Sequence, residues 1–135
     1  MTKLTLFEKT VMCKLLHGEH PFLENLRNQF LHCEVVSQNY TGMGFFIDFK
    51  VDKKFAYGNV NSEIGDVDAK MDGIQHGIGF VLFIRQGLLS MLEGYTYDEP
   101  YPTEIVQYSL YYINGNERGD VRNLVGFPLK AIVQT

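Results

Sequence analysis

The carboxylates and phenols between Gln86 and Glu117 are the side chains of this chain best placed to do chemistry. This stretch has no Lys or Arg, yet it holds five acidic residues and six of the eight tyrosines. Acidic groups attract a cationic surface, and tyrosine supplies a large contact area at low entropic cost. The pattern predicts a binding surface for a basic protein, made by Glu93, Tyr95, Tyr97, Asp98, Glu99, Tyr101 and Glu104. The alternative is a tyrosine-rich sheet edge with solvated carboxylates, because Tyr is common in strands.

Glu93 favours a second interpretation, a pocket carboxylate. Side chains two apart on a strand share a face, so Glu93 is expected to point with Leu89 and Met91 toward the core. A buried carboxylate can act as a general acid or base, and Asp66 and Asp68 could join it. This predicts a small-ligand-binding protein or a small enzyme, with the helices forming one wall of the pocket. Structural salt bridges or a solvated face would explain the same residues.

No other motif indicates catalysis, a metal or a cofactor. The candidate zinc ligands straddle two helix ends and match no zinc spacing: Cys13, His17, His20, His32 and Cys33. The glycines of His76 to Gly79 precede a strand, whereas a phosphate loop follows one. We therefore expect no catalytic residues, no metal and no cofactor, and we favour a protein that is not an enzyme.

The elements that must position these residues begin with two helices. Thr5 and Glu8 have the spacing of a capping box for a helix from about Thr5 to His17. Pro21 suits the first turn of a second helix, whose apolar face is Phe22, Leu23, Leu26 and Phe30.

Alternating patterns then predict strands, with a polar loop over Asp52 to Ser62. The expected strands are Glu34–Tyr40, Phe45–Val51, Asp66–Met71, Ile78–Ile84, Leu88–Tyr97 and Thr103–Ile113. Short connections favour antiparallel pairing. The sequence thus predicts a single α+β domain over residues 1–135, with two N-terminal helices packed on a mainly antiparallel sheet of about five to six strands.

Composition restricts the partners and the location. A formal net charge of −4 and the lack of a Lys/Arg cluster argue against nucleic acid. Glu8 and Lys9 interrupt any signal-peptide pattern, and the apolar run Ile78–Ile84 is too short to span a bilayer. We expect no membrane partner, a cytoplasmic location and buried free thiols at Cys13 and Cys33. Homodimerisation through an exposed sheet edge is a third interpretation.

Several motifs together resemble one family. These are His20-Pro21, Leu26-Arg27, Thr41 to Phe46, Gly79 to Ile84, Leu92 to Tyr97 and Pro100 to Pro102. They resemble an uncharacterised family of small bacterial proteins with an LEGYTY-like motif, in which Trp usually stands where this chain has Tyr101. That resemblance covers about residues 14–103 and implies no activity. In size and charge the chain is also similar to immunity proteins of bacterial toxin systems, which implies a basic toxin domain as the partner.

Overall fold

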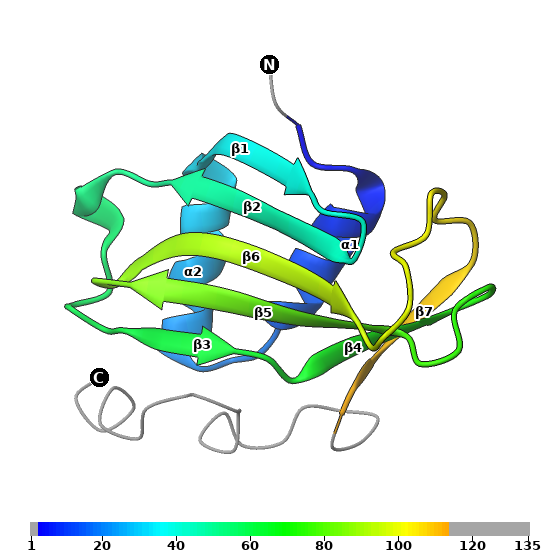
Figure 1. The fold of residues 1–135 in the computed structure, drawn as a ribbon. Helices are drawn as coiled ribbons and strands as arrows, with labels where there is room; N and C mark the ends of the chain where they lie inside the picture. The colour runs from blue at the N-terminus through cyan, green and yellow to red at the C-terminus, as the bar shows by residue number, and fades with distance from the viewer. Residues whose placement is uncertain (1–2, 114–135) are drawn as a thin grey trace.

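The computed structural model describes residues 3–113, in which two helices precede a sheet (Figure 1). The helices are α1 (Leu6–Leu15) and α2 (Pro21–His32). The strands are β1 (Glu34–Tyr40), β2 (Gly44–Lys50), β3 (Ser62–Ile64), β4 (Val67–Met71), β5 (Ile78–Arg85), β6 (Leu88–Thr96) and β7 (Tyr108–Tyr112). A single 3-10 turn, Lys53–Phe55, separates β2 from β3. Glu117, which closes the acidic stretch, lies outside the described residues.

Both helices begin where their caps predict. The Thr5 hydroxyl accepts a hydrogen bond from the Glu8 amide at 3.1 Å, and the Glu8 carboxylate accepts one from the Thr5 amide at 2.8 Å. At α2, Nδ1 of His20 accepts from the Phe22 amide at 3.1 Å, and Pro21 fills the first turn. These bonds satisfy amides that the start of a helix leaves free, which fixes the residue at which each helix begins.

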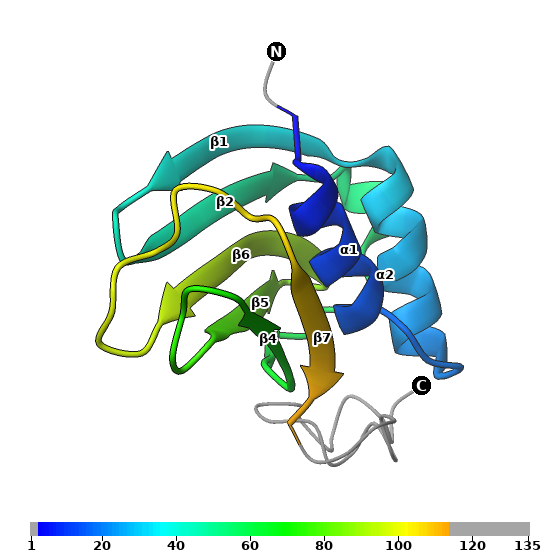
Figure 2. The same cartoon turned by 90° about the vertical axis from the view of Figure 1, so that its right-hand side faces the viewer.

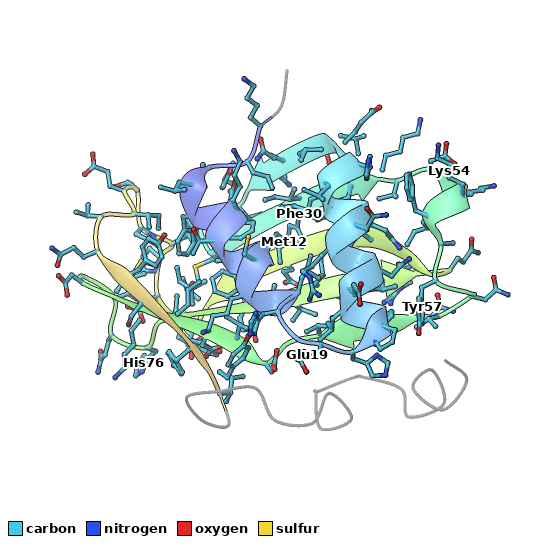
Figure 3. The ribbon with its side chains drawn as sticks, turned by 180° about the vertical axis from the view of Figure 1, so that it is seen from behind. Met12, Glu19, Phe30, Lys54, Tyr57 and His76 are labelled. Carbon is cyan, nitrogen blue, oxygen red and sulfur yellow. The ribbon has the colours of Figure 1, made fainter. Side chains whose placement is uncertain are left out.

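The sheet is antiparallel throughout, in the order β1-β2-β6-β5-β4-β7, and β3 pairs with the far half of β5. Both helices lie against the same face, as the side view shows (Figure 2). Seen from behind, α1 and α2 stand in front of the strands (Figure 3). The predicted α+β class is confirmed, and within the described residues the second face of the sheet carries no helix.

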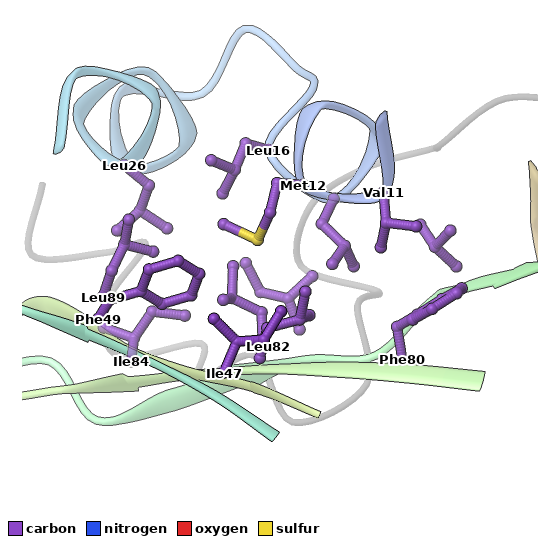
Figure 4. Packing of buried hydrophobic residues seen from close by; sticks show 14 of the residues in the cluster. Val11, Met12, Leu16, Leu26, Ile47, Phe49, Phe80, Leu82, Ile84 and Leu89 are labelled. Atoms are coloured by element: carbon purple, nitrogen blue, oxygen red, sulfur yellow. The ribbon is translucent and has the colours of Figure 1, made fainter. Parts of the chain in front are cut away.

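Side-chain alternation separates the two faces. Ile47, Leu92 and Leu82 lie opposite one another on β2, β6 and β5, and all three are fully buried beneath the helices. Met12 of α1 and Leu26 of α2 pack onto this layer from above (Figure 4). Burying each such side chain contributes roughly 1.5–3 kcal/mol, so the covered face determines the register of the sheet.

The β5–β6 hairpin is fastened to α2 by a buried amide. Gln86 and Gly87 form its two-residue turn with φ of 53° and 77°, the left-handed values that such a turn needs. Gln29 of α2 is fully buried, and its Nε2 donates to the Gly87 carbonyl at 2.8 Å. Its Oε1 accepts from the Leu89 amide at 2.9 Å. The hairpin that carries Glu93 and Tyr95 is thus held rigidly to the helices.

Three expectations about the elements are wrong. The expected strand Thr103–Ile113 begins only at Tyr108, because its partner β4 ends at Met71, which pairs with Tyr108. The short, half-polar strand β3 was not expected; it begins at Ser62, the last residue of the predicted loop. Cys13 is exposed, since the buried stripe of α1 runs through Val11, Met12 and Leu15 on the other side; Cys33 is half-buried.

Candidate functional site

The face of the sheet without helices carries the candidate site, which we call the open face (toward the viewer in Figure 1). Strand pairing places its side chains in three rows. The rows are Asp48–Met91–Phe83, Phe46–Glu93–Val81 and Tyr95–Gly79–Asp68. Gly79 and Asp68 are buried, and the other seven residues of the rows are half-buried. The rows contain both apolar and acidic side chains.

The charges on the open face are unevenly placed. Asp48, Glu93 and Asp68 occupy the central rows. The basic side chains on this face lie outside the three rows, at or near the ends of their strands. Lys50 lies two residues after Asp48, Lys70 two after Asp68, and Arg85 two after Phe83. Arg85 lies 3.8 Å from Glu63, also at the edge. The centre of the face is therefore acidic and its basic groups lie at the periphery.

In the third row two tyrosines gather around a carboxylate. The Tyr97 hydroxyl donates to Oδ2 of Asp68 at 2.9 Å. The rings of Tyr95 and Tyr97 meet edge to face, with centroids 5.4 Å apart at 72°. Tyr95 rests directly on Gly79, where an added Cβ would come within 2.5 Å of its Cζ. Gly79 thus lets the Tyr95 ring lie against the strand beside Asp68. Tyr111 of β7 lies opposite Asp68 on the other side.

Asp68 is buried without being fully satisfied. Only 9% of it is exposed, and its Oδ1 has no hydrogen-bond partner among the described residues. Burial raises the pKa of the Asp68 carboxyl, while the Tyr97 hydrogen bond opposes the shift. The pKa of Tyr97 is raised by burial and then by its hydrogen bonds to Asp68 and Tyr95. The pKa of Tyr111 is raised by burial and by the Asp68 charge. The phenols of Tyr97 and Tyr111 therefore stay neutral near neutral pH.

The structure brings together three of the predicted binding residues: Glu93, Tyr95 and Tyr97 on the open face. It corrects one expectation for Glu93. The pairing of β5 with β6 shifts between Phe83 and Ile84, so the alternation of β6 breaks after Leu89. As a result, Glu93 points away from Leu89 and Leu92. Its carboxylate lies on the face opposite the helices, so the helices do not form a wall of a pocket around it.

Asp98 and Glu99 follow in the turn after β6, where they differ from each other. Asp98 is exposed with φ of 58°. Glu99 accepts hydrogen bonds from the amides of Gln75 at 2.9 Å and His76 at 2.7 Å, and these bonds lower the pKa of its carboxyl. Glu99 ties two loops together, which gives its carboxylate a structural explanation that the sequence did not indicate.

Tyr101 lies away from the open face. Tyr101 packs edge-on against the core residue Phe45, with ring centroids 5.8 Å apart. Burial, followed by the charge of Glu8, raises the pKa of Tyr101 to about 12. Glu104 is exposed in the loop before β7. The predicted segment therefore divides between two sides of the molecule and forms no single patch.

Tyr101 instead borders a groove of about 660 Å³ between the start of α1 and the loop before β7. Glu8 lies in this groove, 2% exposed, and its carboxylate is well partnered. Tyr40 donates to Oε2 at 2.5 Å, while the Thr5 amide and Gln38 donate to Oε1 at 2.8 and 3.3 Å. Burial and Glu8 raise the pKa of Tyr40. These bonds explain Glu8 as a structural group.

From the sequence, Asp68 was expected only to join Glu93 in a pocket, and Phe46, Val81 and Phe83 were not identified as surface residues. The alternation Val67, Ala69, Met71 places Asp68 outward, and the three buried residues confirm it. What it could not show was the phenol 29 residues away that covers it.

The comparisons add no relative. The chain matches no family model, no curated protein and no solved structure. Within residues 3–113, no three His, Cys, Asp or Glu side chains are grouped so that they could hold a metal ion. Neither described helix is long and apolar enough to cross a membrane. The family resemblance stays a prediction.

Proposed function

We propose that this chain is a non-enzymatic binding protein that docks a basic protein on the open face, as an immunity protein docks a toxin domain. The observation that supports the proposal is the charge pattern of the three rows. Asp48, Glu93 and Asp68 lie among apolar and aromatic side chains, and the basic groups are peripheral. Opposite charge speeds association, while aromatic anchors at the centre of an interface supply affinity.

The rigidity of the open face also suits docking. β6 and β5 form its centre, and their hairpin is held to α2 by the buried amide of Gln29. A surface that is already ordered loses little conformational entropy on binding. The proposal includes a cytoplasmic location, which the sequence predicts, and a partner that is a toxin domain encoded beside this chain.

Charge reversal at Glu93 tests the proposal. Glu93→Lys places a cation in the middle row, and Glu19→Lys makes the same charge change on the helix side (Figure 3). With the basic domain encoded by the adjacent reading frame, stopped-flow mixing should give an association rate about tenfold lower for Glu93→Lys, with a weaker salt dependence. Glu19→Lys should stay within about twofold of the parent.

Equal association rates for the two variants would remove the open face as the docking surface. An adjacent reading frame without a basic domain would remove the toxin partner. Glu99 is unsuitable for this test, because its carboxylate holds the amides of Gln75 and His76 and reversal would alter the loop.

Homodimerisation stays a separate prediction. Strand β1 pairs with β2 alone, so its outer edge is unpaired within the described residues. Such an edge is a template for another strand. Light scattering should give the mass of two chains at high concentration if the edge is used, and the mass of one chain if it is not.

A further inference from the structure

We infer that Asp68, Tyr95 and Tyr97 form a binding site for a lysine ammonium group of the docked partner. This inference rests on the proposed function, since it names the chemical group that the open face recognises. We call these three residues the Asp68 site. The unpartnered Oδ1 would accept from the ammonium group, and the two rings would flank it.

Among the described residues, Oδ1 of Asp68 lacks a hydrogen-bond donor. A carboxylate has only acceptor atoms, and a buried one without donors costs stability. Tyr97 supplies one donor, to Oδ2. Lys70 lies on the same face two residues along β4, but Oδ1 has no partner in the part of the chain that the structure describes, so Lys70 does not satisfy it. A buried group that its own fold leaves unsatisfied calls for an explanation, and a ligand donor provides one.

The aromatic rings of Tyr95 and Tyr97 lie beside the carboxylate. A cation over the face of such a ring gains about 0.5–2 kcal/mol of attraction. Gly79 is what permits this arrangement, since any larger residue there would push Tyr95 off the strand. Tyr97 remains 36% exposed, so its ring lies at the surface; Oδ1 is itself shut off from solvent, and the ammonium group reaches it only when the Tyr97 side chain moves aside.

The hydrogen bond from Tyr97 to Oδ2 favours an ammonium group over a guanidinium. A guanidinium binds a carboxylate best through two parallel hydrogen bonds. At Asp68 it would have to share Oδ2 with the Tyr97 hydroxyl, whereas Oδ1 has no donor among the described residues. An ammonium group is a compact point charge that one oxygen and two rings can satisfy.

The test uses the full chain and n-butylammonium chloride as the probe, with n-butanol plus sodium chloride as the neutral control. The carboxyl carbon of Asp68 and the ring signals of Tyr95 and Tyr97 are followed by NMR. We expect saturable shifts with n-butylammonium and none with the control. Asp68→Asn should weaken binding at least about fivefold, because the amide carries no charge. The matched variant Glu19→Gln, on the helix side of the molecule, should change it less than about twofold.

Tyr97→Phe provides a second variant, which keeps the carboxylate and frees Oδ2. It should bind the probe at least as tightly as the parent, so the test still works if Asp68→Asn does not fold. Shifts that do not saturate, or equal binding by Asp68→Asn, would overturn the inference, as would tighter binding of ethylguanidinium than of n-butylammonium. In those cases a slower association of Glu93→Lys with the basic domain would still support the proposed function.

Discussion

Among residues 3–113, the buried side-chain polar atoms on the helix-covered side of the sheet have hydrogen-bond partners, whereas Oδ1 of Asp68 on the open face has none. Gln29 makes hydrogen bonds with the Gly87 carbonyl and the Leu89 amide, and Glu8 accepts from Tyr40 and the Thr5 amide. Asp68 has one donor for two oxygens.

The difference separates polar groups that stabilise the fold from one that the fold tolerates. A satisfied network fixes the position of its elements, while a half-satisfied carboxylate lowers stability. Natural sequences break local rules of this kind mainly at functional sites. We therefore assign the proposed binding role to Asp68 rather than to Glu8.

Removing Gln29 should have the largest effect on stability. Gln29→Ala leaves the buried Leu89 amide without its acceptor and opens a cavity, so the free energy of unfolding should fall by about 2–3 kcal/mol. Urea denaturation followed by circular dichroism measures it. Asn28→Ala, on the exposed side of α2, should change it by less than about 0.5 kcal/mol. A small loss at Gln29 would mean that its bonds do not hold the hairpin.

The sequence predicted most of the fold because the covered face leaves strong periodic patterns. The stripe Phe7, Val11, Leu15 and the alternation of Val67, Ala69 and Met71 are both buried as expected. The short strand β3 was missed because three half-polar residues carry no such pattern; they form a strand because β5 extends past β4 and leaves Ile84 to Leu82 to be paired.

The candidate site was harder to predict, since it depends on register between distant strands. Glu93 was expected to face the core, but the bulge at Phe83 and Ile84 reverses the alternation after Leu89. Tyr97 and Tyr101 are four residues apart, yet one reaches Asp68 and the other packs on Phe45. The chain leaves the sheet after Thr96, and no local pattern encodes where it goes next.

Asp68→Asn should raise stability at neutral pH, the opposite of the Gln29 result. The pKa of Asp68 is raised in the folded chain, so the folded state holds the proton more tightly than the unfolded state does. The parent protein therefore loses stability as pH rises through that pKa, and the Asn variant does not. We expect a gain of about 1 kcal/mol at neutral pH.

The gain should vanish below the ordinary pKa of aspartate, where both side chains are neutral. Urea denaturation from about pH 3 to about pH 8 follows the difference. Asp98→Asn, exposed in the turn after β6, is the control and should show no such pH dependence. Destabilisation by Asp68→Asn at neutral pH would mean that the carboxylate is satisfied, and the contrast between the two faces would fail.

Glu99→Gln should have the smallest effect, confined to the loops at the edge of the open face. Glu99 holds the amides of Gln75 and His76, and these bonds lower the pKa of its carboxyl. Their contribution is therefore present above the ordinary glutamate pKa of 4.5 and is lost as pH falls through the lowered value. One glutamine oxygen cannot replace two carboxylate oxygens, so both amides should exchange hydrogen faster in the variant, while the global free energy of unfolding stays unchanged. Residue-resolved hydrogen exchange measures this.

Because Tyr97 lies two residues before Glu99, loosening this turn should also weaken n-butylammonium binding about twofold. Faster exchange with unchanged binding would mean that Asp68 alone orients Tyr97.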